Sequence, residues 1–321
     1  MVATPASASP RKDARRIAPS RLAWLALCGA LLVWPAAQAQ DAASLRARHA
    51  ALRETLSTNA FRRPLHVESR QGDGELRGDI HAVIEQPYAS VGPALTPVGA
   101  WCDILMLHLN VKQCTASRSS AGEALRLAIG RKFDQPLADA YRFEFGYRVL
   151  AARPDYLHIA LQADEGPLGT RRYRIQVEVV ALDAQRSFLH MSYSYAHGAV
   201  ARMAMQTYLA TAGRDKVGFS VVGTDAGGRP VHVGGTRGVI ERNTMRYYLA
   251  VEAYLGALAV PAAQRQEKRL NDWHSGVERY PLQLHELERD DYLRMKRGEL
   301  RRQQASLARA PGPSGRLRIA A

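Results

Sequence analysis

The sequence predicts an α+β protein in which a curved antiparallel sheet wraps a long C-terminal helix, with extra helices after it. Three observations lead to this fold class. Between residues 125 and 195, apolar and polar side chains alternate with the period of strands that bury one face. Turn-forming residues divide that stretch into segments of strand length. Residues 236–260 then have apolar side chains at spacings of three, four or seven, which is typical of a helix with a buried face.

The first 39 residues have the three zones of an export signal. A basic segment that ends at Arg21 precedes an apolar run over residues 22–34 and a small-residue exit at Ala37-Gln38-Ala39. Because the run would form a helix of roughly 20 Å, shorter than the ~30 Å hydrocarbon core, a cleaved signal is favoured over a membrane span. We therefore predict cleavage after Ala39 and a periplasmic protein. The segment carries five Lys/Arg and one acid, so its removal lowers the formal net charge from +14 to +10.

The mature chain is expected to begin with a helix and a hairpin. Residues 40–62 contain leucines at helical spacing and form the predicted N-terminal helix, which ends before Pro64. Residues 66–84 have extended character, with Gly72-Asp73-Gly74 as the turn of a hairpin.

Two short helices and a series of strands follow. The helices are predicted at residues 87–95 and 98–107 and are separated at Thr96-Pro97. The alternation then predicts antiparallel strands around residues 125–129, 141–149, 157–161, 173–179 and 189–195. The aromatic segment at residues 141–147 is interpreted as core or, alternatively, as the lining of a ligand pocket.

Two helices near the end of this region are candidates to fill the groove of the sheet. The first is predicted at residues 199–212, and a hairpin with strands at 217–222 and 230–233 separates it from the second, at 236–260. A helix of about 24 residues is roughly 36 Å long, enough to cross a sheet of several strands at ~4.8 Å spacing. Length therefore favours the second helix.

The C-terminal part is predicted to be helical and strongly basic. Residues 261–305 form a helical extension broken at Tyr280-Pro281, and residues 306–321 a disordered tail. Because the helices beyond Tyr280 are polar, we expect them to contribute little to the core. Their cations form either a solvated face or a surface that attracts anionic membrane. They are Arg294, Lys296, Arg297, Arg301 and Arg302. Export argues against nucleic acid as a partner.

Two cysteines, Cys102 and Cys114, remain after the predicted cleavage. Thiols oxidise readily outside the cytoplasm, so a disulfide between them is predicted. It would close a loop of about a dozen residues and stabilise the fold by roughly 3 kcal/mol. The spacing does not fit a zinc site.

Recognised catalytic and cofactor motifs are missing from the sequence. There is no nucleophile elbow, zinc-protease motif, phosphate-binding loop or dinucleotide-binding loop. The ten histidines are scattered without metal-ligand spacing. We therefore assign no catalytic residue, metal site or cofactor, and we favour a protein without enzymatic activity over an enzyme.

The start of the long helix is the most unusual segment. Three glycines, Gly234, Gly235 and Gly238, lie at its start, which leaves backbone N–H groups open to an anion that Arg237 would also contact. The alternative is an ordinary hairpin exit. Asn243 shares the apolar stripe with Tyr247, so its amide needs either a core partner or a ligand. Arg242 and Arg246 are four residues apart and would accommodate an anion between them.

Glu241 is interpreted as an ion-pair partner of Arg237, which lies four residues earlier in the same helix. The candidate ligand-binding residues are Arg237, Glu241, Asn243, Arg246 and Tyr247.

The order of a strand, two short helices, a run of antiparallel strands and a long helix over residues 63–260 resembles the helix-grip fold of START-like (SRPBCC) domains. The resemblance is one of topology. It implies a sheet that encloses a cavity for an apolar or amphipathic ligand. The helix at 199–212 and the hairpin after it depart from the pattern.

The first functional hypothesis is a periplasmic binding protein for a lipid-like or amphipathic small molecule. The alternatives are an enzyme that uses the same cavity and an envelope-associated interaction protein that acts through the basic C-terminal helices.

Overall fold

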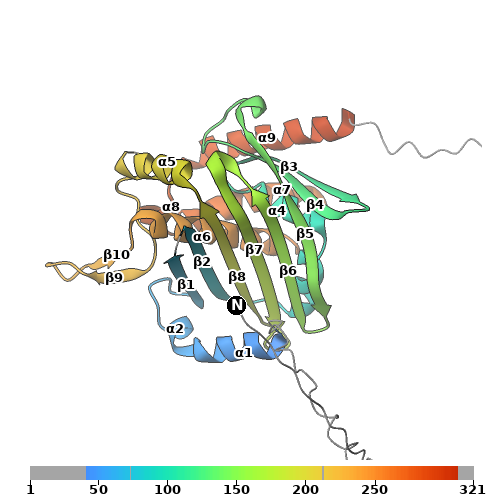
Figure 1. The fold of residues 1–321 in the computed structure, drawn as a ribbon. Helices are drawn as coiled ribbons and strands as arrows, with labels where there is room; N and C mark the ends of the chain where they lie inside the picture. Colours follow the sequence, from blue (N-terminus) through green and yellow to red (C-terminus); the bar gives the residue numbers. More distant parts are fainter. Residues whose placement is uncertain (1–40, 73, 212, 310–321) are drawn as a thin grey trace, which may run out of the picture. The chain divides into compact units, whose positions relative to one another are not determined.

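One eight-stranded antiparallel sheet organises the structure, a computed structural model that describes residues 41–72, 74–211 and 213–309. The strand order is β1-β2-β8-β7-β6-β5-β4-β3 (Figure 1). The strands are β1 Leu65–Gly72, β2 Glu75–Ile84, β3 Val111–Ser119, β4 Gly122–Ile129, β5 Tyr141–Arg153, β6 Tyr156–Glu165, β7 Thr170–Ala181 and β8 Ser187–His197. The predicted signal at 1–39, the turn residue Asp73 and the chain beyond Arg309 lie outside the described residues.

The helices cover both faces of this sheet, mainly the concave one. They are α1 Ala42–Ala51, α2 Arg53–Ser57, α3 Tyr88–Leu95, α4 Val98–Leu105, α5 Ala199–Ala210, α6 Gly235–Gly256, α7 Ala262–Val277, α8 Pro281–Leu284 and α9 Arg289–Arg309. A separate hairpin joins β9 Val221–Thr224 to β10 Pro230–His232. The predicted single helix at 40–62 is in fact two, α1 and α2. The helix predicted to end at residue 305 extends to Arg309.

The predicted alternation is confirmed by the register of the strands. Tyr193 pairs with Ile175, and Met191 pairs with Val177, so that the apolar residues of β7 and β8 share the concave face. On the opposite face, Phe188 and Val180 form a smaller core under α1. Burial on both faces of the sheet therefore follows from a strict period of two.

Strand β3 was not predicted. Its sequence contains Lys112, which is buried, and a register shift lies between Val111 and Gln113. A bulge and a buried cation both break the alternation by which strands are detected. Cys114 of β3 is bonded to Cys102 of α4, with Cα atoms 5.2 Å apart, so the predicted disulfide is confirmed.

Helix α6 lies in the groove of the sheet, as its length predicted, but it covers only the edge formed by β1, β2 and β8. It packs against β1, β2 and β8, and Gly78 of β2 permits the approach, since a Cβ there would lie 2.3 Å from Thr244 Oγ1. Helix α7 covers the other side of α6, so that α6 is buried nearly all round. It ends at Gly256, four residues before the predicted end.

The helices beyond Tyr280 belong to the core, so the expectation that they contribute little to it is wrong. Tyr292 of α9 is completely buried, stacks on Trp273 at 4.9 Å and donates a hydrogen bond to Leu107 O (3.0 Å). Polar side chains that anchor α9 made the helix look solvated in the sequence. The hydrophobic pattern alone does not register a buried tyrosine or lysine of this kind.

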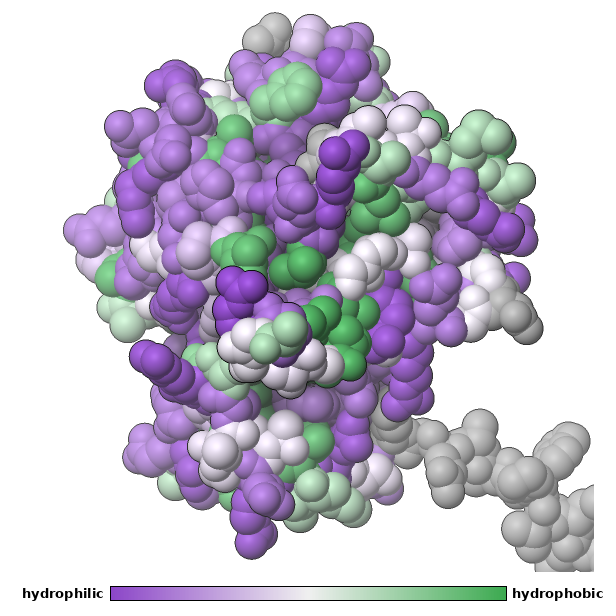
Figure 2. Space-filling model, turned by 90° about the vertical axis from the view of Figure 1, so that its left-hand side faces the viewer, coloured by the Kyte–Doolittle hydropathy of each residue, from purple (hydrophilic) through white to green (hydrophobic). Residues whose placement is uncertain are grey.

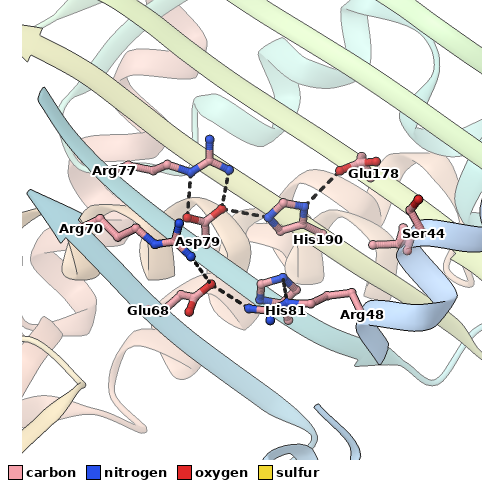
Figure 3. Close-up of a pocket in the computed structure, with 10 residues that line it drawn as sticks. Ser44, Arg48, Glu68, Arg70, Arg77, Asp79, His81, Glu178 and His190 are labelled. Atoms are coloured by element: carbon pink, nitrogen blue, oxygen red, sulfur yellow. Dashed lines mark hydrogen bonds and ion pairs between the residues drawn. The ribbon is translucent and has the colours of Figure 1, made fainter. Parts of the chain in front are cut away.

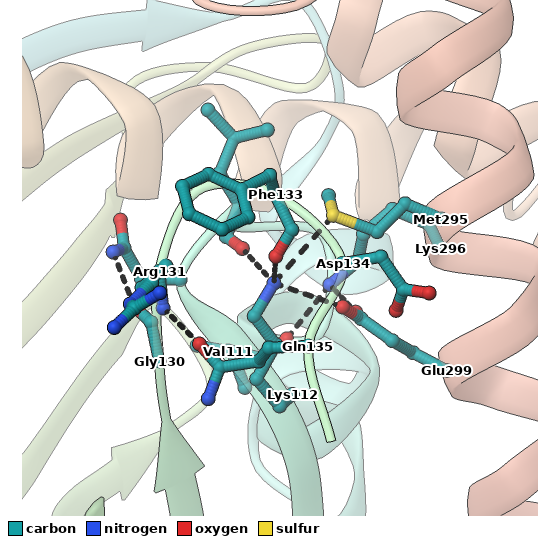
Figure 4. Close-up of polar contacts among 12 residues, drawn as sticks. Val111, Lys112, Gly130, Arg131, Phe133, Asp134, Gln135, Met295, Lys296 and Glu299 are labelled. Atoms are coloured by element: carbon teal, nitrogen blue, oxygen red, sulfur yellow. Dashed lines mark hydrogen bonds and ion pairs between the residues drawn. The ribbon is translucent and has the colours of Figure 1, made fainter. Parts of the chain in front are cut away.

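Three buried charges hold α9 to β3 (Figure 4). The Glu299 carboxylate accepts from Lys112 Nζ (3.0 Å) and from Lys296 Nζ (2.6 Å). Lys296 also donates to His108 O and Val111 O, and all three charged side chains are sealed from solvent. Burial lowers the pKa of Lys296 to about 8, although Glu299 opposes the shift. Lys296 is therefore not part of an exposed basic surface.

The other cations of the predicted membrane-binding set are mostly engaged as well. Arg294 pairs with Asp291, Arg297 with Glu267 and Arg302 with Asp134. Arg301 is exposed. The basic C-terminal helices are thus held by acids of the same molecule, which leaves little free cationic surface there.

We predict that Glu299→Ala lowers the free energy of unfolding by about 3–5 kcal/mol, because it leaves two buried ammonium groups without their shared counter-ion. Urea unfolding followed by circular dichroism measures the change. Glu267→Ala, which removes the half-exposed partner of Arg297, is the matched control and should cost less than about 1 kcal/mol. Equal effects of the two changes would show that the buried triad does not anchor α9.

Candidate ligand cavity

A cavity of about 1460 Å³ lies on the concave side of the sheet, beside the N-terminal half of α6. Strands β4, β5, β7 and β8 line one side of it, and α5 and α6 line the other. Figure 2 views the side of the molecule with α5 and the β9–β10 hairpin, and shows apolar surface gathered near the centre between hydrophilic rims. The cavity exists because α6 covers only one edge of the sheet and α5 only partly closes the rest.

Aromatic side chains form one wall of the cavity. Phe143 and Phe145 come from β5, Tyr173 from β7 and Tyr193 and Tyr195 from β8. Tyr173 stacks on Tyr195 at 5.3 Å and lies 5.8 Å from Phe143. Such rings offer a large apolar surface with defined packing directions. An apolar or aromatic body would therefore lie against this wall.

Tyrosine hydroxyls give the same wall a polar edge. Tyr247 of α6 contacts Tyr193 edge-on at 5.4 Å, and burial raises the pKa of both phenols. Their hydroxyls remain protonated at neutral pH. Within the described residues, neither hydroxyl has a hydrogen-bond partner, so both are available to a ligand.

His108 lies beside these tyrosines. Its ring stacks on Tyr247 at 4.8 Å, and Nδ1 accepts a hydrogen bond from the Asn110 backbone N–H (3.1 Å). Burial lowers the pKa of His108 well below its ordinary value, and the nearby cations Arg246 and Lys296 lower it further. The ring is therefore neutral. Since Nδ1 is an acceptor, the proton is on Nε2, which has no partner among the described residues.

Two cations complete this end of the cavity. Arg246 Nη2 donates to Glu286 Oε1 (2.9 Å) and Leu284 O (3.1 Å), while its buried Nε has no partner among the described residues. Lys132 pairs with the same Glu286 and lies over the Tyr208 ring. One carboxylate thus serves two cations, and the local charge stays positive.

Three of the five predicted site residues line the cavity: Asn243, Arg246 and Tyr247. The Asn243 amide forms no hydrogen bond to any described residue, so the interpretation in which a core neighbour satisfies it is wrong. The amide faces the cavity instead. Arg242, which the sequence paired with Arg246, also lines it.

The other two predicted residues, Arg237 and Glu241, have structural roles. Glu241 is fully buried and accepts from Ser69 Oγ (2.6 Å), Phe219 N (2.6 Å) and Ser220 N (2.9 Å). Arg237 donates to Ser69 Oγ (3.1 Å) and does not line the cavity. The predicted pairing of Arg237 with Glu241 is absent among the described residues, because Glu241 ties α6 to the loop before β9.

Residues that line the cavity from outside α6 were not predicted from the sequence. His108, Lys132 and Tyr173 reach the cavity from a loop, a second loop and a strand. No local spacing connects them with α6. Only the aromatic alternation in β5 gave a usable signal, since Phe143 and Phe145 do line the cavity, while Tyr147 is core and Tyr141 is exposed.

A second, smaller polar pocket of about 220 Å³ lies on the opposite face of the sheet, under α1 (Figure 3). His190 bridges two carboxylates, with Nδ1 3.0 Å from Glu178 and Nε2 2.9 Å from Asp79. Arg77 holds Asp79 through two hydrogen bonds. Burial opposes protonation of His190, yet the hydrogen bonds to both acids raise its pKa. The cluster pairs nearly all of its own charges.

His81 stacks on His190 with ring centroids 4.5 Å apart. Its Nε2 accepts from Arg48 of α1 (3.3 Å), and Glu68 of β1 pairs with the same arginine. Burial lowers the pKa of His81 to about 3, and the neighbouring His190 and Arg48 lower it further. One ring of the stack is therefore neutral, whereas the two carboxylates raise the pKa of the other.

We predict that His81 makes the fold less stable as the pH falls from 6.5 to 5. The unfolded chain takes up a proton on His81 below about pH 6.5, whereas the folded chain does so only near pH 3. This difference costs on the order of 1–2 kcal/mol over the window. His190, whose pKa is raised, loses its contribution only as the pH rises above 6.5. The acids, whose pKa values are lowered, lose theirs only below about pH 4.5.

Urea unfolding at pH 6.5 and pH 5 tests this prediction with wild type and His81→Gln, since glutamine still accepts from Arg48 but does not titrate. The variant should show a clearly smaller loss of stability between the two pH values. An unchanged loss would contradict the assignment of His81 as a buried neutral ring.

No group of residues able to hold a metal ion occurs in the described part of the chain. None of the helices described is both long and apolar enough to cross a membrane.

No known protein-family profile matches the chain, and no curated protein matches it. Among solved structures, it is similar to the Zhui aromatase/cyclase from Streptomyces sp. R1128, with 13% identity and a TM-score of 0.30 over 67% of this chain and 96% of that one. A START superfamily protein from Mycobacterium smegmatis is 14% identical over 46% and 92% of the two chains, with a TM-score of 0.28.

The norcoclaurine synthase from Thalictrum flavum, solved with dopamine and hydroxybenzaldehyde, is 11% identical over 44% of this chain and 76% of that one, with a TM-score of 0.29. The chain itself has the α+β architecture predicted from the order of its elements, an eight-stranded antiparallel sheet with the long helix α6 against it.

Proposed function

We propose that this chain is an exported binding protein that holds an amphipathic small molecule in the concave cavity. The cavity itself supports the proposal. Protein interiors are close-packed and rarely contain voids much larger than a water molecule, whereas ligand sites enclose some hundreds of cubic ångströms. A space of about 1460 Å³ with one aromatic wall and separate polar donors fits a molecule with an apolar body and a polar head.

Binding is favoured over catalysis by the composition of the lining. None of the described residues around the cavity is Asp or Glu, and His108 is held neutral by burial. A general acid and a general base with separated pKa values are thus not paired there. An envelope role for the basic C-terminal helices has less support, because Lys296 is buried and three of its four companions are paired.

We predict that Asn243→Trp weakens binding of the uncharged fluorescent probe phenylnaphthylamine by about tenfold, because the indole occupies the middle of the cavity. Fluorescence titration of the purified protein measures the dissociation constant. Asn271→Trp places the same side chain on α7, away from the cavity, and should bind like wild type. Absence of binding by wild type, or equal binding by all three proteins, would refute the cavity as a ligand site.

Export supplies a separate prediction. The intact mass of protein expressed with its own leader and recovered from the periplasm should correspond to a chain that begins at Gln40 and contains the Cys102–Cys114 bond. A recovered chain that retains residues 1–39, or one that takes up two alkylating groups without reductant, would contradict export with cleavage and oxidation.

A further inference from the structure

The charge of the cavity lining is one-sided. Six lining residues are Lys or Arg, and none of the described lining residues is Asp or Glu. The six are Arg131, Lys132, Arg171, Arg202, Arg242 and Arg246. Charges inside a low-dielectric cavity act over longer distances than they do in water. A ligand in this cavity therefore experiences a strongly positive surrounding.

Arg242 is the less compensated of the two buried cations, Arg242 and Arg246. It is only 2% exposed, and it donates a single hydrogen bond, from Nη1 to Val217 O (3.2 Å). No carboxylate lies within ion-pair distance of it among the described residues. A buried arginine normally has an acid or several acceptors, since an unpaired buried charge is costly. Its remaining donors lack acceptors within the described chain.

The neighbours of Arg242 are donors as well. Arg246 follows one turn later on the same face of α6, and its buried Nε has no partner among the described residues. His108 presents an unpartnered Nε2–H, fixed there because Nδ1 accepts from Asn110. Asn243 and Tyr247 lie between and beside them on the same helix face. Acceptors for this group of donors must come from outside the described chain, from water or from a ligand.

We propose that the ligand is an amphipathic oxyanion whose negatively charged oxygens bind at Arg242, Arg246 and His108 and whose apolar body lies against Phe143, Phe145 and Tyr173. This inference rests on the proposed binding function and specifies its ligand class. A planar guanidinium recognises carboxylate and phosphate oxygens through charge-assisted hydrogen bonds. Glu286 lies behind the site, where it orients Arg246 and Lys132 without neutralising both.

Two probes with closely similar aromatic bodies test the inference: anilinonaphthalenesulfonate, which carries a sulfonate, and phenylnaphthylamine, which is uncharged. In Arg242→Gln the dissociation constant of the sulfonated probe should rise about tenfold or more, while that of the neutral probe stays within about twofold. Arg126→Gln removes an equal charge from an exposed arginine of β4 that does not line the cavity, and should change neither.

Arg202→Gln keeps the test decisive if Arg242→Gln fails to fold. Arg202 lies exposed on α5 at the cavity, so its replacement leaves the core intact and should weaken only the sulfonated probe, by about threefold. Competition by dodecanoate and by dodecyl phosphate, with dodecanol as the neutral control, distinguishes a carboxylate ligand from a phosphate ester.

The outcomes separate the two proposals. Weaker binding of the sulfonated probe alone in the arginine variants supports the oxyanion site. If both probes weaken alike in the arginine variants, or neither changes, the oxyanion inference is overturned while cavity binding stands. If the neutral probe fails to bind wild type, or Asn243→Trp does not weaken it, the binding function itself fails.

Discussion

The structure depends on holding α6, a helix that carries charges on several faces, in a site where it is buried nearly all round. Its buried charges need partners from other parts of the chain, because an unpaired buried charge costs several kcal/mol, and Arg242 is the one that lacks an acid among the described residues. Glu241 obtains hydrogen bonds from the loop before β9, and Arg246 obtains Glu286 from the loop before α9. The departures from a simple sheet-and-helix plan, the β9–β10 region and the C-terminal helices, thus supply what α6 needs.

The sequence predicted those parts of the fold in which burial follows a strict period. In β7 and β8, every second residue is apolar and lies on the concave face, so both strands and their shared face were foreseen. Strand β3 and the packing of α9 were not, for one physical reason. Lys112, Lys296 and Glu299 are buried as a mutually compensating group, and each of them reads in the sequence as a solvated residue.

Prediction of the candidate site was limited in the same way, because only signals between residues close in the sequence can be detected. Asn243 and Tyr247 were found because a polar amide interrupts an apolar helical stripe to which Tyr247 belongs, which is a local signal. The role of Glu241 was misjudged because its partners, Ser69 and Ser220, are distant in the sequence. Local spacing favoured Arg237 as a partner, but tertiary contacts offered Glu241 several neutral donors instead. The sequence does not show which of these partners Glu241 takes, because the neutral donors come near it only when the chain folds.

Similar polar residues lie on the two faces of the sheet but have different roles there. Under α1, Asp79, Glu178 and His190 satisfy one another, and Arg48 of α1 contacts His81 and Glu68 of the same pocket. On the concave face, Arg242, Arg246 and His108 line the cavity and have donors without acceptors among the described residues, and of the described acids only Glu286 pairs with any of the three. A closed polar network stabilises a fold, whereas donors without acceptors cost stability until a ligand supplies them. That asymmetry makes the concave cavity, and not the cluster under α1, the place where a ligand would bind.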